Sequence, residues 1–359
     1  MQNKSDSLSL TISASSHEYL VQIGAGIFTT HMEKFDGFLL ADQRFESMIK
    51  NAGITKVVYV EALEDNKVLS TVESVLIEFK NLGMTRDDSL VAVGGGIIQD
   101  IATLAASLYM RGVAWSYFPT TLLGMTDSCI GGKSSINAGV VKNLVGNIYP
   151  PDEILIDVDF LETLNQIDIH AGLAEAAKIS FCSGPEAFRT YLELVGDNSD
   201  NEYVEMLYFV LSQKKWFIEI DEFDRAERKL LNFGHTFGHA LESATNHEIP
   251  HGIAVAMGIR AAVSFVASKR EIGAIEIQLD NYMSGLCSCG LDYGSLLRTI
   301  DWNKFASAFA GDKKHSIDSY KLITPLKKGG VEIGSFEKSA ELIEEVKTAQ
   351  LKILKEMAT

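Results

Sequence analysis

Short apolar runs alternate with amphipathic stretches in the first half of the chain. Residues 8–12 and 19–23 alternate apolar and polar side chains, which predicts the two strands of a hairpin. The β-branched runs at residues 57–60 and 90–93 are typical of buried parallel strands, and residues 68–82 between them have helical periodicity. This alternation predicts a Rossmann-like parallel sheet. Further strands are expected at residues 114–118 and 154–156.

The pattern changes after residue 165, where apolar positions recur mainly at helical spacing. Only residues 320–323 resemble a strand in this half. We therefore predict an α/β chain with a Rossmann-like domain over residues 1–165 and a mostly helical domain over residues 166–359. A functional site is expected between the two. Helices are expected at residues 169–180, 202–220, 226–244, 252–270 and 339–357.

Composition limits the classes of partner. The length of 359 residues suits about two domains, and a hydrophobic content of 46% suits a globular core. The net charge of −16 argues against nucleic acid, whose phosphates need a basic face. The most apolar run, residues 90–110, contains three glycines, Gln99 and Asp100, so it predicts a strand, a turn and a helix rather than a membrane span.

The four cysteines do not form a metal-binding motif. Cys129, Cys182, Cys287 and Cys289 include no CxxC pair, and the CxC at 287–289 lacks a second half. We interpret them as reduced thiols of a cytoplasmic protein.

A glycine loop joins a predicted strand to a predicted helix at Gly94, Gly95 and Gly96. Glycine lets the backbone approach a pyrophosphate, and a helix N-terminus favours negative charge. A bare tight turn is the alternative, but the position between strand and helix favours a nucleotide. The loop is not GxGxxG, so an ordinary dehydrogenase fingerprint is absent.

Three histidines and a glutamate are candidates for metal chemistry. His235 and His239 lie four residues apart and would share a helix face, and His251 follows twelve residues later. Glu175 and Lys178 lie among small residues on a predicted helix, although alone they could be a surface pair. One glutamate and two histidines would make a zinc site with an open position. Spacing leaves two pairs open: His235 with His239, the default, or His235 with His251 if His239 faces the substrate.

Lysines beside glycines and amides suit a phosphate site in this acidic chain. Lys133 follows two glycines, and Lys142 precedes Asn143. A solvated loop is the alternative. Lys214, Arg228 and Lys314 supply further cations.

In this order, the motifs resemble the 3-dehydroquinate synthase family of sugar phosphate cyclases. The resemblance extends from about residue 24 to residue 330. It implies an N-terminal NAD-binding domain over residues 1–165 and a C-terminal metal- and substrate-binding domain over residues 166–359. The matching motifs are residues 94–100, 119–123, 127–133, 142–143, 174–178, 232–242, 251–252 and 312–314.

The resemblance also implies roles for individual residues. Zinc, with cobalt as a possible substitute, would be held by Glu175, His235 and His251. NAD would be contacted by Asp42, Glu64, Lys67, Gly94, Gly95, Gly96, Asp100, Thr120, Thr121, Lys133, Lys142, Phe160 and Thr163. The substrate phosphate would be bound by Lys133, Asn143, His239 and Lys314, with Arg111 reaching across a homodimer. The substrate carboxylate would be bound by Lys214 and Arg228. The ring hydroxyls of the substrate would be bound by Asp127, Lys178 and Asn232.

The implied reaction converts 3-deoxy-arabino-heptulosonate 7-phosphate into 3-dehydroquinate and phosphate, a step of aromatic amino acid biosynthesis. It proceeds by transient oxidation with NAD, phosphate elimination, re-reduction and internal aldol closure. Arg228 favours this substrate over sugar phosphates without a carboxylate, because a guanidinium forks onto a carboxylate. The expected partner is thus a phosphorylated sugar acid, with no nucleic acid and no membrane.

Several alternatives and departures stay open. The alternatives are a cyclase of the 2-epi-5-epi-valiolone or 2-deoxy-scyllo-inosose type, a metal-dependent polyol dehydrogenase, and a catalytically silent homologue. Gln99 stands where the family usually has a glycine, and residues 138–141 replace a usual His-Pro-Leu-Gly. Both departures lie near the predicted nucleotide and phosphate sites.

Overall fold

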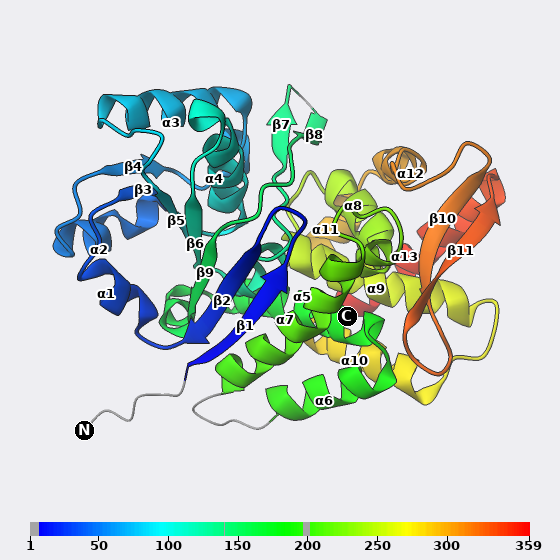
Figure 1. Ribbon diagram of the computed structural model, residues 1–359. Coiled ribbons are helices and arrows are strands. Elements are labelled where there is room, and N and C mark those ends of the chain that lie inside the picture. Colours follow the sequence, from blue (N-terminus) through cyan, green and yellow to red (C-terminus); the bar gives the residue numbers. More distant parts are fainter. Residues whose placement is uncertain (1–6, 140, 197–201) are drawn as a thin grey trace. The chain divides into compact units, whose positions relative to one another are not determined.

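The computed structural model describes residues 7–139, 141–196 and 202–359 (Figure 1). Their contacts form two compact units. Unit 1 runs to Leu164 and also includes the segment that carries α7 (Glu202–Ile220) and ends at Phe223. Unit 2 consists of Asn165–Gly196 and Asp224–Thr359. Residue 140, within the 138–141 departure, lies outside the described residues.

Unit 1 is built on a 7-stranded sheet in the order β1-β2-β9-β6-β5-β3-β4. The first two strands form the predicted hairpin, with Leu8 opposite Ile23. The other neighbours in the sheet are parallel, as predicted. The strands are β1 (Leu8–Ser13), β2 (Glu18–Gly24), β3 (Phe38–Asp42), β4 (Val57–Val60), β5 (Leu90–Gly94), β6 (Trp115–Pro119) and β9 (Glu153–Asp157).

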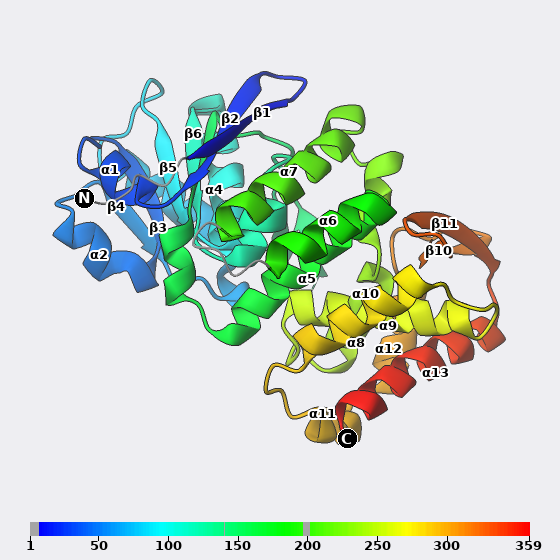
Figure 2. The same ribbon diagram turned by 90° about the horizontal axis from the view of Figure 1, so that it is seen from below.

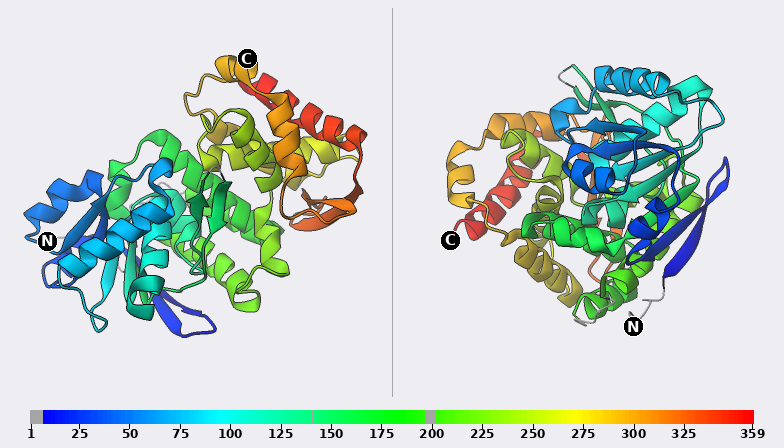
Figure 3. Two further views of the ribbon diagram at one scale, coloured as in Figure 1. Left: turned by 90° about the horizontal axis from the view of Figure 1, so that it is seen from above. Right: turned by 90° about the vertical axis from the view of Figure 1, so that its left-hand side faces the viewer.

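Helices cover both faces of this sheet (Figure 1). Right-handed crossovers place α3 and α4 on the face opposite α1 and α2, because the strand order reverses after β4. Figure 3 shows α3 beside α4, which packs on β5 and β6, while α7 packs on β1 and β2. The bounds are α1 (Ile27–Met32), α2 (Glu46–Asn51), α3 (Leu69–Asn81) and α4 (Gly96–Leu108).

Three features of unit 1 were absent from the sequence prediction. Strand β3 consists of five buried residues, a run too short to show a period. After β6 the chain forms a π-helical turn, η4 (Gly124–Ser128), which carries Asp127. A small hairpin of β7 (Ile136–Ala138) and β8 (Val141–Val145) follows.

Unit 2 is a helical unit arranged around α9 (His251–Ala267), which is buried along most of its length. Helices α5, α8, α10 and α13 pack against α9 (Figure 2). The helices are α5 (Gln166–Cys182), α6 (Pro185–Val195), α8 (His235–Ala244), α10 (Ala274–Cys287), α11 (Tyr293–Thr299), α12 (Trp302–Ala310) and α13 (Ala340–Met357).

Two expectations about unit 2 were wrong. The single helix predicted over residues 226–244 is divided into a 3₁₀ turn, η6 (Glu227–Asn232), and α8, because Gly234 between them has a left-handed φ of 78°. The strand predicted at residues 320–323 is β10 (Ser319–Pro325), but it pairs with a second strand, β11 (Val331–Glu337), that was not expected. Among the described residues, no helix is both long and apolar enough to cross a membrane.

Candidate active site

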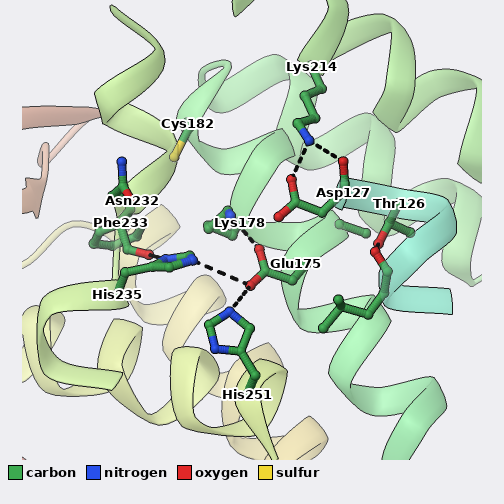
Figure 4. A network of polar contacts seen from close by, with 12 residues as sticks. Thr126, Asp127, Glu175, Lys178, Cys182, Lys214, Asn232, Phe233, His235 and His251 are labelled. Atoms are coloured by element: carbon green, nitrogen blue, oxygen red, sulfur yellow. Dashed lines mark hydrogen bonds and ion pairs between the residues drawn. The ribbon is translucent and has the colours of Figure 1, made fainter. Parts of the chain in front are cut away.

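Three helices of unit 2 bring the predicted metal ligands together. Glu175 lies within α5, and His235 and His251 are the first residues of α8 and α9. The Oε1 atom of the fully buried Glu175 lies 3.8 Å from Nε2 of His235 and 3.7 Å from Nε2 of His251 (Figure 4). Lys178, one turn along α5, forms a buried ion pair with the other carboxylate oxygen. The carboxylate therefore faces two imidazoles on one side and an ammonium on the other.

Glycines make this close approach possible. A Cβ atom on Gly258 of α9 would lie 2.2 Å from the carbonyl oxygen of Gly234, just before α8. A Cβ on Gly252 would lie 2.3 Å from the carbonyl oxygen of Ala171 in α5. No side chain fits at such distances, so the backbones of α5, α8 and α9 touch at these points. The glycines flanking the histidines are thus part of how the site is positioned.

The outer nitrogens of two histidines are held by acceptors. His251 Nδ1 lies 3.3 Å and 3.4 Å from the two carboxylate oxygens of Glu242, in α8. His235 Nδ1 lies 3.2 Å from the carbonyl oxygen of Phe233. Donation from Nδ1 leaves the Nε2 lone pair facing Glu175, which is the arrangement of metal-binding histidines.

His239 differs from its two neighbours. Its ring centre lies 5.3 Å from that of His235 and 5.5 Å from that of His251. Within the described part of the chain, its ring makes no hydrogen bond, and the side chain is exposed. Its orientation is therefore left to a bound molecule. This favours His235 and His251 as the ligand pair over the default pair of one helix face.

Electrostatics keep two of these imidazoles neutral. Burial, reinforced by Lys178, lowers the pKa of His235 well below its usual value. Although part of the His239 side chain is open to solvent, partial desolvation by the surrounding protein, reinforced by His251 and Lys314, lowers its pKa to about 4. Burial alone would lower the pKa of His251, but the hydrogen bond to Glu242 raises it. Neutral imidazoles offer a lone pair to a cation.

The donor set fits a divalent metal such as zinc or cobalt. Ligand atoms of His235, His239 and His251 all lie within 4.8 Å of one another, and Glu175 supplies a carboxylate oxygen beside two of them. Imidazole nitrogen with one carboxylate is a usual ligand set for catalytic zinc.

Other predicted substrate residues lie on the same unit. Arg228 is buried in η6, and Asn232 ends that turn. Lys314 Nζ lies 2.9 Å from Asp312, whose carboxylate also accepts from the Lys314 backbone N–H at 3.0 Å. The loop of Lys314 follows α12, which packs against α8, the helix that carries His235 and His239.

The predicted NAD contacts of unit 1 gather at one edge of the sheet. They follow the carboxyl ends of parallel strands, which meet at the same edge. Helix α4 begins directly after Gly95 and has no side-chain cap. Its first backbone N–H groups therefore point toward this edge without a capping side chain. At or just after the ends of β3, β4, β5, β6 and β9 lie, respectively, Asp42; Glu64 and Lys67; Gly94, Gly95 and Gly96; Thr120 and Thr121; Phe160 and Thr163.

Lys67 connects several of these positions. Its Nζ lies 3.2 Å from Asp100, 3.5 Å from Glu64 and 2.8 Å from Asn143 Oδ1. Burial raises the pKa of Asp100 to about 7 although Lys67 opposes this. Asn143, predicted for the substrate phosphate, therefore shares one lysine with residues predicted for NAD.

Asp127 and Lys214 are paired in unit 1. Lys214 Nζ, from α7, lies 2.7 Å from Asp127 Oδ1 and also contacts the Asp127 carbonyl oxygen (Figure 4). The sequence prediction gave these residues separate parts of the substrate. If Lys214 binds the substrate carboxylate, it would therefore do so while it is also paired with the Asp127 carboxylate.

At the sheet edge, Thr163 Oγ1 donates to the carbonyl oxygen of Phe160 at 2.7 Å. Three predicted residues remain. Lys142 is exposed on β8, and Lys133 forms a bridge to Ile148. Arg111 is exposed and has a left-handed φ of 74°.

Comparison with known proteins settles the family. The N-terminal domain model of 3-dehydroquinate synthase matches residues 57–171, and the C-terminal domain model matches residues 172–315. The chain belongs to the 3-dehydroquinate synthase family. A 3-dehydroquinate synthase of Dictyoglomus turgidum is 33% identical over 337 residues, covering 90% of this chain and 93% of that protein. One of Streptococcus pneumoniae is 36% identical over 265 residues, covering 72% and 73%.

Solved structures share the fold of this dehydroquinate synthase family member. The 2-epi-5-epi-valiolone synthase of Streptomyces hygroscopicus, with NAD+ and Zn2+ bound, has a TM-score of 0.80 at 22% identity, covering 96% of this chain and 99% of that one. A 2-deoxy-scyllo-inosose synthase complexed with carbaglucose-6-phosphate, NAD+ and Co2+ has a TM-score of 0.76 at 21% identity, covering 97% and 100%. The family and fold predicted from sequence are confirmed.

Sequence reasoning missed two supporting residues. Glu242 lies seven residues after His235, which places it on the same face of α8, so its spacing was an available signal. Asp312 precedes Lys314 by two residues, and nothing in that spacing indicates that its carboxylate holds both the side chain and the backbone N–H of Lys314.

Proposed function

We propose that this chain is a 3-dehydroquinate synthase, a lyase that converts 3-deoxy-arabino-heptulosonate 7-phosphate into 3-dehydroquinate and phosphate. The observation that carries the proposal is the buried Glu175 carboxylate facing Nε2 of His235 and His251, in a chain of this family. The enzyme would depend on NAD and a divalent metal and would serve aromatic amino acid biosynthesis in the cytoplasm.

We assign the metal to Glu175, His235 and His251, and the nucleotide to the sheet edge of unit 1. When bound, the metal supplies a Lewis acid for the oxygen of the reacting hydroxyl, and NAD supplies the acceptor and donor of hydride. The N–H groups at the start of α4 would hold the pyrophosphate. Lys67, Glu64 and Asp100 would hold a ribose, because their charges already gather at one place.

The chain's own residues would bind and orient the substrate. Arg228, a buried guanidinium, is assigned to the substrate carboxylate. Lys178 holds the Glu175 carboxylate and is assigned to a ring hydroxyl. His239, whose ring is not fixed by a protein acceptor, is assigned to the phosphate together with Lys314. Holding both ends of a small molecule fixes the reacting carbon, which lowers the entropic part of the barrier.

Arg111 is proposed to complete the phosphate site of a partner subunit in a homodimer. Its exposure and left-handed backbone are consistent with a contact outside its own subunit. Mixing inactive Arg111→Ala with inactive Lys133→Ala subunits should restore part of the activity, because one site of each hybrid dimer is then intact. Absence of any restoration in a demonstrated hybrid would contradict action across subunits.

The assay that tests the function compares substrates. Purified protein with NAD and zinc or cobalt should release one phosphate per heptulosonate phosphate consumed, without net NADH. Release from sedoheptulose 7-phosphate instead would transfer the chain to another cyclase class, and steady NADH accumulation with a polyol would indicate a dehydrogenase. Elemental analysis should find metal in the wild type and none in His251→Ala.

A further inference from the structure

Gln99 makes a buried side-chain contact that the proposed site does not use. It lies near the start of α4 and is 2% exposed. A buried amide is unfavourable unless both its donor and its acceptor are satisfied. Gln99 Nε2 donates to the carbonyl oxygen of Ser128 at 2.6 Å, and Gln99 Oε1 accepts from Ser128 Oγ at 2.5 Å. Both ends of the amide are therefore used on one residue.

Ser128 is the last residue of the π-helical turn η4. The turn closes with a hydrogen bond from the Cys129 N–H to the Gly124 carbonyl oxygen at 3.0 Å. Gly131 and Gly132, with φ of 99° and 60°, then lead the chain away from the helix. The Ser128 carbonyl thus has no continuing helix to bond, and the Gln99 amide takes that place as a side-chain cap.

The capped turn carries Asp127, which is held from a second element as well. Lys214 of α7 binds the Asp127 carboxylate at 2.7 Å and lies 3.4 Å from the Ile130 carbonyl oxygen. Gln99 of α4 therefore holds one side of this segment and Lys214 holds another. Asp127 lies between the two anchors.

The same contact reaches the glycine loop. A Cβ on Gly96, the first residue of α4, would lie 3.8 Å from Ser128 Oγ, so Ser128 is beside the start of the helix. Asp127 is thereby joined to the rigid helix that begins at the proposed pyrophosphate site. Motion of the turn relative to α4 would need both bonds to Gln99 to break.

We propose that Gln99 is a positioning residue that holds Asp127 in the orientation needed for the sugar phosphate. The proposal rests on the proposed function, since Asp127 is assigned there to a ring hydroxyl. Gln99 touches neither substrate nor nucleotide in this role; it acts through Ser128. Its effect is on substrate turnover and not on NAD affinity.

The test uses isosteric methionine variants of the NAD- and metal-loaded enzyme. In Gln99→Met, kcat/KM for the heptulosonate phosphate should fall about tenfold, while the Kd of NAD stays within about twofold. Ser128→Ala keeps its carbonyl and should lose less, about threefold. The double variant should match Gln99→Met alone, because the two residues share one interaction.

Gln350→Met is the matched control. Gln350 of α13 is fully buried too, and neither its Oε1 nor its Nε2 has a partner among the described residues. Removing it should leave kcat/KM unchanged. Wild-type kcat/KM in Gln99→Met, even with lowered thermal stability, would overturn the positioning role. An equal loss of NAD affinity would overturn it too, because the effect would then come through the glycine loop.

Amide hydrogen exchange separates this proposal from the proposed function. Backbone amides of residues 124–130 should exchange at least about tenfold faster in Gln99→Met than in wild type, and at wild-type rate in Gln350→Met. If the wild type does not convert the heptulosonate phosphate, the proposed function fails. Hydrogen exchange alone then tests whether the contact of Gln99 with Ser128 holds the turn. Unchanged exchange in Gln99→Met would then overturn it.

Discussion

Gly258→Ala is the sharpest probe of how the metal site is built. The new Cβ would lie 2.2 Å from the Gly234 carbonyl oxygen and 2.7 Å from the Gly238 nitrogen. Ordinary contacts begin near 3.4 Å, so a gap of about 1 Å must open between α8 and α9. Neither obstructing atom belongs to a side chain that could rotate away.

The expected loss of stability follows from two opposing effects. Overpacking of this kind destabilises by about 1–3 kcal/mol, with backbone obstruction favouring the upper end. Alanine gains about 1 kcal/mol over glycine in a helix interior. We expect a net loss of about 2 kcal/mol in the free energy of unfolding of the metal-free protein, measured by urea titration.

Gly285→Ala is the matched control. Gly285 lies within α10 of the same unit, and nothing stands within 4 Å of its Cβ position. This substitution should stabilise by up to about 1 kcal/mol. The two alanines therefore have effects of opposite sign.

Metal binding gives a second measurement of the same displacement. Zinc tolerates deviations of only about 0.2 Å in its ligand distances, so a shift of about 1 Å between His235 and His251 should weaken binding at least about tenfold. Competition with a chromophoric chelator would measure this. If Gly258→Ala is as stable as Gly285→Ala, or binds zinc like the wild type, the idea that glycine contacts set the site is wrong.

Three further predictions test other parts of the structure. Glu242→Ala should weaken zinc binding about 10–100-fold because His251 loses the acceptor on Nδ1, whereas Glu248→Gln, at an exposed glutamate nearby, should not; equal zinc affinity of the two variants would contradict this role. Arg228→Ala should lower kcat/KM for the carboxylated substrate at least about a hundredfold, and near-normal turnover would refute its assignment. Asp100 has a folded pKa raised to about 7, so its unfavourable ionisation should reduce stability as pH rises from about 4 to about 7; in Asp100→Asn this slope should be smaller, as urea titrations at several pH values would show.

Local patterns predicted much of the fold but not its breaks. The hairpin at residues 8–23 and the strand–glycine–helix unit at residues 90–108 could be predicted because each segment shows the hydrophobic pattern of only one kind of secondary structure. The helix expected over residues 226–244 could not be divided correctly, because its apolar pattern continues through Gly234. A Cβ on Gly234 would lie 2.8 Å from the Val255 carbonyl oxygen of α9, so the glycine is needed there for packing between helices, which the local pattern does not record.

The site shows the same division. Glu175, His235 and His251 could be named because the motifs resemble a known family, yet spacing alone left the choice between His239 and His251 open. What favours one pair is the set of acceptors behind the rings, Glu242 and the Phe233 carbonyl, which only the folded backbone brings into place. The partner of Gln99 could not be predicted either, because Ser128 is distant in sequence and lies at the end of a π-helical turn.

Helix α7 has a practical consequence for anyone who would divide this protein. The chain passes between the two units after Leu164, again before α7, and a third time after Phe223. A fragment that ends at the boundary of the two family domains, near residue 171, would leave the sheet without α7 and without Lys214. Two halves divided at this boundary and expressed separately should therefore reach the native fold only when both are present together. A circularly permuted chain should likewise have its new termini at a position other than residue 171.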